Sequence, residues 1–325
     1  MSYHYRMIVA AICGATAVGK SALALRLARA NGFGIISADS RQIYRGLVIG
    51  TGAPTGPERA AAPHHLIGIA DPREAFSPRA YPPKVHELLA TRPGDRFLIV
   101  GGTGLYLREL FFPSPFDRGP TPDAVKAEVQ ERLRAKGAPA LHAELAAVDP
   151  EAAAAVHPND AYRIAKRWEN LLLMGESYTR LAGPPVRDPR LADVPIVWLD
   201  REREDLYRRI DARVEAMIRA GWAEEARALA ADPGWNEAPA RSSLGYAEMT
   251  EVAAGRMDAK AALEAIRKRT RNYAKRQRTF FRSQLPGAVR WDCDAFETLC
   301  EECSWGWEAV AARLGNAPNG GESGF

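Results

Sequence analysis

The sequence has no long hydrophobic run and few cysteines. No stretch of about 18 or more apolar residues occurs, so we expect no segment that spans a membrane. The N-terminal residues run directly into a strand-like segment, without the pattern of a cleavable signal. Only four cysteines occur, and no second CxxC pair or HxxxH pattern accompanies Cys300 and Cys303. These absences argue against a zinc site and favour a reduced, cytoplasmic protein.

One segment lacks acidic residues altogether. The whole chain carries 44 basic and 40 acidic residues, and this excess is too small to indicate nucleic-acid binding by itself. Residues 267–282, "RKRTRNYAKRQRTFFR", contain eight Lys and Arg and no Asp or Glu. Such a concentration is typical of a surface that binds a polyanion, although a solvated charged face produces the same pattern.

Short apolar runs alternate with helical patterns along much of the chain. Strand-like runs occupy residues 6–13, 33–40 and 194–200, and another begins at residue 96 and is broken by glycines before a helix. A helical pattern follows the first of them. This alternation predicts an α/β fold with a P-loop-type parallel sheet flanked by helices.

The character of the sequence changes after a Pro-rich joint, "FFPSPFDRGPTP". Ala-rich helical stretches follow it, and no strand pattern returns until residue 194. We therefore predict an all-helical insertion domain within the α/β core. The expected divisions are the first part of the core at 1–115, the insertion at 116–190, the second part with long helices at 191–312, and a disordered tail at 313–325.

The stretch "GATAVGKS" matches GxxxxGK[ST] and lies between a strand and a helix, the context that this motif requires. Its glycines let backbone N–H groups turn toward a phosphate, and the following helix N-terminus adds positive potential. A chance glycine-rich turn is the alternative. The predicted phosphate cradle comprises Gly14, Ala15, Thr16, Ala17, Val18, Gly19, Lys20 and Ser21, with Ser21 able to bind Mg²⁺.

The strand expected to carry a metal-binding Asp in a nucleotide hydrolase, "FLIVGGTG", ends instead in glycines and Thr103. An acid does follow the strand "GIIS", at Asp39. A residue at that edge of a parallel sheet faces the crevice in which ligands bind. From its position, Asp39 can be a metal ligand, a general base or the N-cap of a helical turn.

Six blocks together resemble one family, the tRNA dimethylallyltransferases. They are "GATAVGKSALA", "IISADSRQIYRGLVIGTGAPT", "PHHLIGIADPREAFS", "VGGTGLYLREL", "HPNDAYRIAKRWE" and "RNYAKRQRTFFR". The "SADSRQIYRG" and "GGTGLY" blocks are specific to this family and to relatives that prenylate free adenine nucleotides. The blocks lie between residues 14 and 282, most of the chain.

The resemblance implies which phosphate the cradle holds. The cradle would bind the diphosphate of dimethylallyl diphosphate, with Mg²⁺, rather than ATP. The dimethylallyl group would pass to N6 of the adenine immediately 3′ of the anticodon in tRNA, and diphosphate would leave. The implied partners are the tRNA anticodon stem-loop and dimethylallyl diphosphate, with no membrane and no protein partner.

The resemblance also implies roles for single residues. Asp39 would accept a proton from, or hydrogen-bond to, the adenine amine, and Thr103 would help to hold the diphosphate and the reacting groups. Arg209 and Arg213 match arginines that reach the diphosphate, although long helices also carry exposed arginines. Contacts with tRNA are expected from Asp39, Ser40, Arg41, Gln42, Tyr162, Arg163, Lys166, Lys275, Arg278 and Arg282.

Other residues are assigned no chemistry. Tyr273, Phe280 and Phe281 are expected in the core, and His64 and His65 are expected to be structural or to shape the channel. The sequence departs from the family pattern at Ala53, Tyr162 and Ser242, all in regions expected to contact RNA.

Three other functions remain to be distinguished. A free-nucleotide prenyltransferase requires neither the insertion nor the basic helix. A small-molecule kinase is disfavoured by the missing metal-binding acid. A non-catalytic RNA-binding protein would not require the cradle, Asp39 and Thr103.

Overall fold

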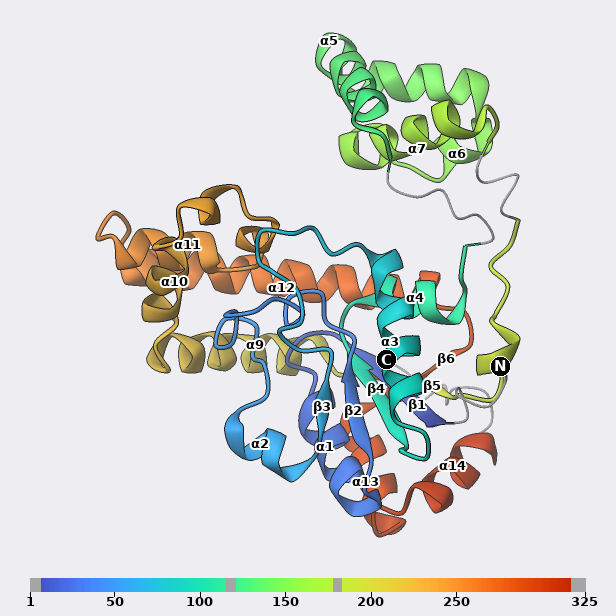
Figure 1. Ribbon diagram of the computed structural model, residues 1–325, viewed down its shortest axis with the longest axis vertical. Helices are drawn as coiled ribbons and strands as arrows, with labels where there is room; N and C mark the ends of the chain where they lie inside the picture. The colour runs from blue at the N-terminus through green and yellow to red at the C-terminus, as the bar shows by residue number, and fades with distance from the viewer. Residues whose placement is uncertain (1–6, 115–120, 178–182, 317–325) are drawn as a thin grey trace. The chain divides into compact units, whose positions relative to one another are not determined.

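The computed structural model describes residues 7–114, 121–177 and 183–316 (Figure 1). The chain divides into two compact units. The larger contains Met1–Phe111 and Asp188–Phe325, and the smaller contains Phe112–Arg187. The backbone N–H of Asp188 donates a hydrogen bond of 2.8 Å to the carbonyl oxygen of Phe111. The chain therefore leaves the larger unit and returns to it at one place.

A six-stranded sheet forms the centre of the larger unit, in the order β3-β2-β4-β1-β5-β6. Every neighbouring pair is parallel, which confirms the predicted α/β fold. The central strands are buried throughout because they are covered on both faces, which suits their apolar sequences. The strands are β1 Ile8–Gly14, β2 Gly34–Ser37, β3 His64–His65, β4 Phe97–Gly101, β5 Ile196–Asp200 and β6 Ala288–Asp292.

Helices pack around this sheet. Helix α1 contacts β1, β2 and β4, while α13 contacts β5, β6 and α1. The long helix α12 contacts β1, α4 and α9. Within the described residues, no helix is long and apolar enough to cross a membrane. The helices of this unit are α1 Lys20–Asn31, α2 Gly56–Ala61, α3 Tyr81–Thr91, α4 Gly104–Phe111, α9 Arg203–Arg219, α10 Trp222–Ala230, α11 Tyr246–Ala253, α12 Ala259–Gln284, α13 Cys293–Glu302 and α14 Trp307–Asn316, with 3₁₀ turns η2 Pro78–Ala80, η3 Pro189–Leu191, η4 Pro233–Glu237 and η5 Pro239–Ser242.

Three features differ from the sequence prediction. The stretch "DLYRRIDARVEAMIRAGWAEEARALAA", whose pattern predicts one long helix, forms two helices, α9 and α10, because Gly221 adopts φ 98° between them. Strands β3 and β6 were not predicted, since β3 has two residues and β6 is an edge strand with exposed side chains. The predicted tail begins too early, because α14 continues to Asn316; residues 317–325 lie outside the described residues.

The described residues of the smaller unit form helices and no strand, with α5 Asp123–Val148, α6 Pro150–Ala154 and α7 Ala161–Met174. Gly137 interrupts α5 with φ 76° and ψ 163°, so α5 consists of two helical arms. Val129, Leu141, Leu145 and Ile164 are fully buried and form a core of this unit's own. Such a core is the property expected of an insertion that folds as a separate body.

Candidate active site

The predicted functional loops meet at one edge of the sheet. The cradle follows β1, Asp39 follows β2 and the "GGTG" loop follows β4, and these three strands are neighbours. Because the strands are parallel, their carboxyl ends lie at the same edge. A cavity of about 780 Å³, hereafter the reaction cavity, opens there between the cradle, α9 and α12. Its lining includes Thr16, Ala17, Gly19, Lys20, Ser21, Asp39, Arg41, Gln42, Arg209, Arg213, Ser242, Tyr273 and Arg276.

The cradle is held by hydrogen bonds to its own carbonyl groups. Lys20 Nζ donates to the oxygen of Ala15 at 3.2 Å, and Arg209 Nε donates to the oxygen of Ala17 at 3.1 Å. Gly19 adopts φ 117°, and a Cβ there would lie 3.0 Å from Cys293 Sγ. The first N–H groups of α1 have no acceptor within the helix, so they are available to donate to a bound anion.

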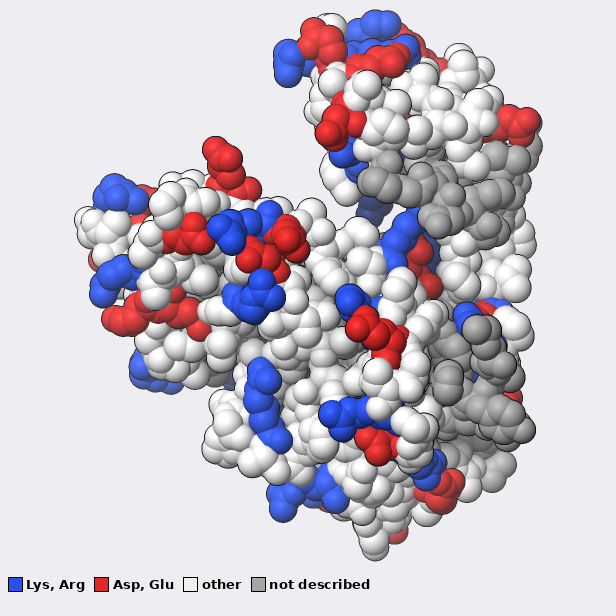
Figure 2. Space-filling view, viewed as in Figure 1, with Lys and Arg blue, Asp and Glu red and all other residues white. Residues whose placement is uncertain are grey.

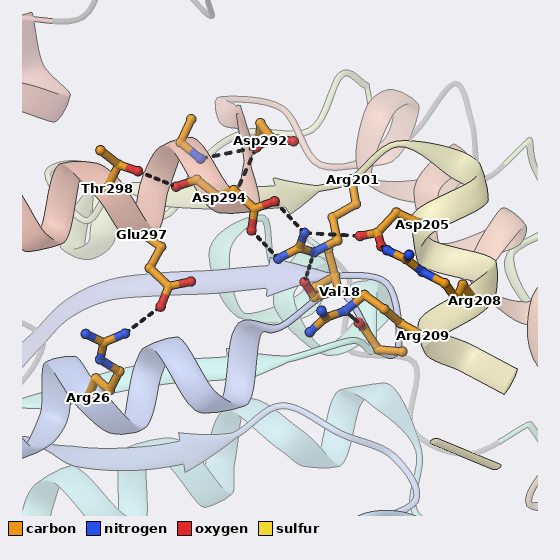
Figure 3. Close-up of polar contacts among 12 residues, drawn as sticks. Val18, Arg26, Arg201, Asp205, Arg208, Arg209, Asp292, Asp294, Glu297 and Thr298 are labelled. Carbon is orange, nitrogen blue, oxygen red and sulfur yellow. Dashed lines mark hydrogen bonds and ion pairs between the residues drawn. The ribbon is translucent and has the colours of Figure 1, made fainter. Parts of the chain in front are cut away.

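Arg201, which the sequence prediction missed, supports the cradle from within the protein (Figure 3). Its side chain is 8% exposed, and its Nε donates to the oxygen of Val18 at 2.8 Å. Asp294 holds the other end of the guanidinium through bonds of 2.7 and 2.6 Å, and Asp205 adds one of 3.1 Å. Arg201 immediately follows the acid that ends β5, which was the only local signal of its role.

The two carboxylate oxygens of Asp39 differ in their contacts: Oδ1 accepts hydrogen bonds within a turn, and Oδ2 has no such bond with a described residue. Its Oδ1 accepts hydrogen bonds from the backbone N–H groups of Arg41, at 2.8 Å, and Gln42, at 3.4 Å. Its Oδ2 has no hydrogen-bond partner among the described residues. The turn-capping and proton-accepting interpretations of Asp39 are therefore compatible, since each uses a different oxygen.

Two cations lie close enough to Asp39 to feel its charge. Burial lowers the pKa of Lys20 to about 8, although the charge of Asp39 opposes this shift. Burial also lowers the pKa of Arg213, against the opposing charges of Asp39 and Glu58. Burial disfavours the charged form of both side chains, so an anion entering the cavity would meet cations that lack full hydration.

Thr103 and Ser40 are hydrogen-bonded to each other next to Asp39. Neither is among the described residues that line the cavity. The hydroxyl of Thr103 accepts a hydrogen bond from Ser40 N–H at 2.9 Å and donates one to Ser40 Oγ at 3.2 Å. Their geometry supports the turn. The predicted contact of Thr103 with diphosphate, and that of Ser40 with tRNA, stay predictions.

The side chains that follow Asp39 are bound to neighbouring segments. Gln42 Nε2 donates to the oxygens of Thr51 and Gly52 at 3.4 and 3.1 Å, and Gln42 Oε1 accepts from Ser37 at 3.0 Å. Arg41 donates to Ser242 Oγ at 3.2 Å while also lining the cavity. Arg41 is thus placed at the rim, while the amide of Gln42 is engaged within the protein.

The expected core position of Tyr273 is wrong. Tyr273 lines the reaction cavity, where burial raises its pKa to about 12. Phe281 is 2% exposed, as expected of a core residue. Tyr273 and Phe281 are eight residues apart on α12, which rotates their side chains by about 80° from each other, so Tyr273 reaches the cavity while Phe281 packs in the core.

Lys275, Arg278 and Arg282 share a face of α12, as their spacing predicts, and line a second pocket of about 440 Å³. This outer pocket is also lined by Trp198, Asp200, Arg203, Tyr207, Thr279 and Arg290. Asp200 is buried and pairs with Arg278 at 2.8 Å and with Arg290 at 3.0 Å. Lys275 and Arg282 form no ion pair with any described residue.

Cations in the first half of the basic segment are neutralised by acids from distant parts of the chain. Arg267 pairs with Glu215, Arg269 pairs with Glu248, and Arg271 pairs with Asp211, with Arg271 Nε 2.9 Å from Asp211 Oδ1. Basic and acidic side chains are interspersed over the α10–α11 region in Figure 2. The lack of local acids therefore does not make the whole segment a free positive surface.

Tyr162, Arg163 and Lys166 lie at the start of α7 in the smaller unit. Tyr162 is 72% exposed. Arg163 Nε lies 3.4 Å from Oδ2 of Asp160, the N-cap residue of α7. Lys166 Nζ donates to Glu169 Oε2 at 2.6 Å. Their contacts with tRNA stay predictions.

The described residues contain no group of three or more His, Cys, Asp or Glu side chains arranged to hold a metal. All four cysteines are free. His64 and His65 form β3, where the ring of His64 bonds to Ala62 and that of His65 packs edge-on against Phe97. Burial lowers the pKa of both histidines.

Comparisons with known proteins agree over nearly the whole chain. A tRNA dimethylallyltransferase from Geobacillus kaustophilus is 39% identical over 303 residues, covering 91% of this chain and 95% of the relative. A solved tRNA isopentenylpyrophosphate transferase from Bacillus halodurans is 31% identical, covers 95% of this chain and 99% of its own, and has a TM-score of 0.63. A eukaryotic dimethylallyltransferase acting on tRNA, 24% identical with a TM-score of 0.76, shares the fold over 97% of this chain and 81% of its own.

Two family models match the sequence. The isopentenyl transferase model matches residues 7–62, which include the cradle and Asp39. The IPP transferase model matches residues 42–284, from the Asp39 turn through α12. The extent of the second match and the full-length relatives show that this chain belongs to the IPP transferase family.

Proposed function

We propose that the protein transfers the dimethylallyl group of dimethylallyl diphosphate to N6 of the adenine immediately 3′ of the anticodon in tRNA, releasing diphosphate. The names of its relatives support a transfer to tRNA. The observation that carries the proposal is the opening of the phosphate cradle and of Asp39 into one cavity. A leaving diphosphate and a proton acceptor are the two groups that this reaction requires.

The cradle acts on the leaving group. As the allylic C–O bond breaks, both of its electrons go to the diphosphate, whose negative charge increases. Lys20, Arg209 and Arg213 line the cavity, and α1 begins at Lys20. Donors fixed in place before the reaction stabilise such developing charge more effectively than water, which must reorganise.

Asp39 acts on the acceptor. The N6 nitrogen forms a bond to the allylic carbon, and the proton that it then loses passes to the free oxygen of Asp39. A positioned carboxylate of this kind accelerates proton transfer when it lies within hydrogen-bond reach of the amine. The other oxygen stays bonded to Arg41 N–H, which holds the carboxylate in orientation.

Magnesium fits the donor set of the cavity. Ser21 is exposed at the start of α1, and Asp39 and Glu58 also line the cavity, so oxygen donors are available without a complete protein cage. We propose that Ser21 holds Mg²⁺ together with diphosphate oxygens. The bound ion would neutralise part of the charge on the leaving group.

The tRNA contacts that we propose come from both units. In the larger unit, Lys275 and Arg282 project charge that no described acid neutralises, and Arg41 lies at the cavity rim. In the smaller unit, exposed Tyr162 and Arg163 are the candidates. Phosphate contacts of this kind fix the position of the RNA without reading its sequence. Because its substrate is tRNA and its four cysteines are free, we propose that the protein acts in the cytoplasm.

The test uses the full chain with labelled dimethylallyl diphosphate and Mg²⁺. One reaction contains a tRNA with adenine 3′ of the anticodon, a second contains the same tRNA with guanine at that position, and a third contains AMP. We expect label in the first tRNA alone, recovered as an N6-substituted adenosine after digestion. Label in AMP would instead support the free-nucleotide alternative, and label in no acceptor would contradict the proposal.

A further inference from the structure

A polar residue lies on the buried stripe of α12. The buried positions of this helix include Ile266, Ala274, Gln277 and Phe281, which fall on one face because they are spaced by about one or two turns. Gln277 is 6% exposed. A buried amide requires partners for both its donor and its acceptor.

Both partners of Gln277 are backbone groups of the active-site loops. The N–H of Thr16, in the cradle, donates to Gln277 Oε1 at 2.9 Å. Gln277 Nε2 donates to the oxygen of Gly102 at 2.8 Å. The amide orientation follows from the chemistry, because the Thr16 N–H can only donate and the Gly102 oxygen can only accept.

The absence of a side chain at Gly102 leaves room for this contact. A Cβ on Gly102 would lie 2.5 Å from Gln277 Nε2, so any other residue at this position would displace the amide. The loop of Gly102 and the side chain of Gln277 are therefore fitted to each other.

The bonds of Gln277 continue toward Asp39. Gly102 precedes Thr103, whose backbone N–H donates to the oxygen of Ala38 at 3.1 Å. The hydroxyl of Thr103 is bonded to Ser40, as described above. Asp39 lies between Ala38 and Ser40. Hydrogen bonds on both sides of the Gly102–Thr103 peptide bond thus join the cradle to the segment that carries Asp39.

We propose that Gln277 is a positioning residue for the transfer reaction. By bridging Thr16 and Gly102, it fixes the separation between the diphosphate cradle and the Asp39 turn, and so the alignment of the leaving group with the acceptor amine. This inference rests on the proposed function. It extends that function to a residue on the helix that also carries the proposed tRNA contacts Lys275 and Arg282.

An uncharged amide is the group that this position requires. Leucine would leave the Thr16 N–H and the Gly102 carbonyl without their partner. Ionised glutamate would still accept from Thr16, but it would place a second oxygen against the Gly102 carbonyl. Protonated glutamate would restore the donor. Leucine therefore removes the hydrogen bonds to both Thr16 and Gly102. Ionised glutamate removes only the one to Gly102, and protonated glutamate keeps both.

The experiment compares the full-length variants Gln277→Leu and Gln277→Glu with a matched control, Ile266→Ala, which truncates another buried residue of the same helix face. For each variant we would measure kcat, the KM for dimethylallyl diphosphate, the Kd for tRNA and the Tm. Calorimetric binding of inorganic diphosphate provides a readout that does not depend on turnover.

For Gln277→Leu we expect kcat to fall about tenfold to a hundredfold, as for a misplaced reacting group. The diphosphate Kd and the tRNA Kd should each change by less than about threefold, because each loop remains present. For Gln277→Glu we expect kcat relative to the wild type to rise as pH falls, because the carboxyl becomes protonated. That ratio for Gln277→Leu should not depend on pH. Ile266→Ala should lower Tm while leaving kcat nearly unchanged.

Three outcomes would overturn the inference. They are a wild-type kcat in Gln277→Leu, an equal loss of kcat in Ile266→Ala, and a pH-independent ratio for Gln277→Glu. If Gln277→Leu does not fold, the pH profile of Gln277→Glu decides alone. A wild-type protein that neither binds diphosphate nor modifies tRNA would overturn the proposed function itself, which is a distinguishable result.

Discussion

Helix α12 lines both the reaction cavity and the outer pocket, and the two differ in the charged groups that they contain. The reaction cavity contains a carboxylate with a free oxygen, Asp39, and a lysine whose pKa burial has lowered. The outer pocket contains five cations, but its one carboxylate, Asp200, is buried against Arg278 and Arg290. The reaction cavity therefore offers groups that exchange or respond to protons, whereas the outer pocket offers fixed positive charge. Substitutions in the cavity and in the pocket should accordingly alter different steps.

The largest effect is expected from Asp39→Asn. It removes the proposed proton acceptor while preserving the shape of the side chain, so the chemical step should slow by roughly 10²-fold or more. Single-turnover kinetics with saturating tRNA measure this step directly. The affinity for tRNA should stay nearly unchanged. Wild-type turnover in this variant would remove Asp39 from the mechanism and erase the distinction between the reaction cavity and the outer pocket.

The next effect concerns Lys20 and pH. Because its pKa lies at about 8, Lys20 is protonated below that pH and neutral above it, so the affinity for dimethylallyl diphosphate should fall as pH rises through about 8. The loss approaches roughly tenfold per pH unit for a single coupled proton. Lys20→Arg should bind without this dependence, since arginine stays charged, and Lys20→Ala should bind weakly at every pH. An identical pH profile in Lys20→Arg would assign the dependence to another group.

A smaller and different effect is expected from Arg282→Ala in the outer pocket. The plot of log tRNA affinity against log salt should lose about one unit of slope, for cognate and non-cognate tRNA alike, while kcat at saturating tRNA stays constant. Arg313→Ala, which removes an exposed arginine of α14 paired with Glu302, is the matched control. Equal slopes in the Arg282→Ala and wild-type proteins would mean that this face of α12 does not hold RNA.

The smallest effect on tRNA binding is expected from Arg278→Ala, because this guanidinium is already committed to Asp200. Its removal should instead destabilise the fold by about 1–3 kcal/mol, since Arg290 is then the one ion-pair partner left to Asp200 among the described residues. Urea unfolding measures the loss. Adding Asp200→Asn to Arg278→Ala should recover part of it, and a failure to recover would contradict the assigned pairing.

The features that could be predicted from the sequence are those that depend on neighbouring residues. Four buried strands, the cradle and Asp39 were recognised because apolar runs and glycine spacing are properties of adjacent residues. The neutralisation of Arg267, Arg269 and Arg271 was not predicted, since their partners lie on α9 and α11. Arg201 was missed for the same reason, because its partner Asp294 is distant in sequence.

Gln277 could have been found from the sequence. It occupies the same helical face as Ile266, Ala274 and Phe281, and an amide on an otherwise apolar stripe signals a buried polar contact. The strong charge of its neighbours Arg276 and Arg278 directed attention to the surface of the helix instead.

The hydrogen bond between Asp188 and Phe111 has a consequence for the evolution of this architecture. The chain leaves the larger unit and re-enters it at adjacent residues, so the smaller unit is attached to it in the way that a loop is. A change in the number of residues in the smaller unit therefore need not disturb the sheet or the cradle. Selection can thus enlarge, shorten or exchange this unit while the α/β core keeps its packing. Because Tyr162 and Arg163 of this unit are proposed to contact tRNA, the proposed function would allow the range of acceptors and the chemistry of transfer to diverge at different rates.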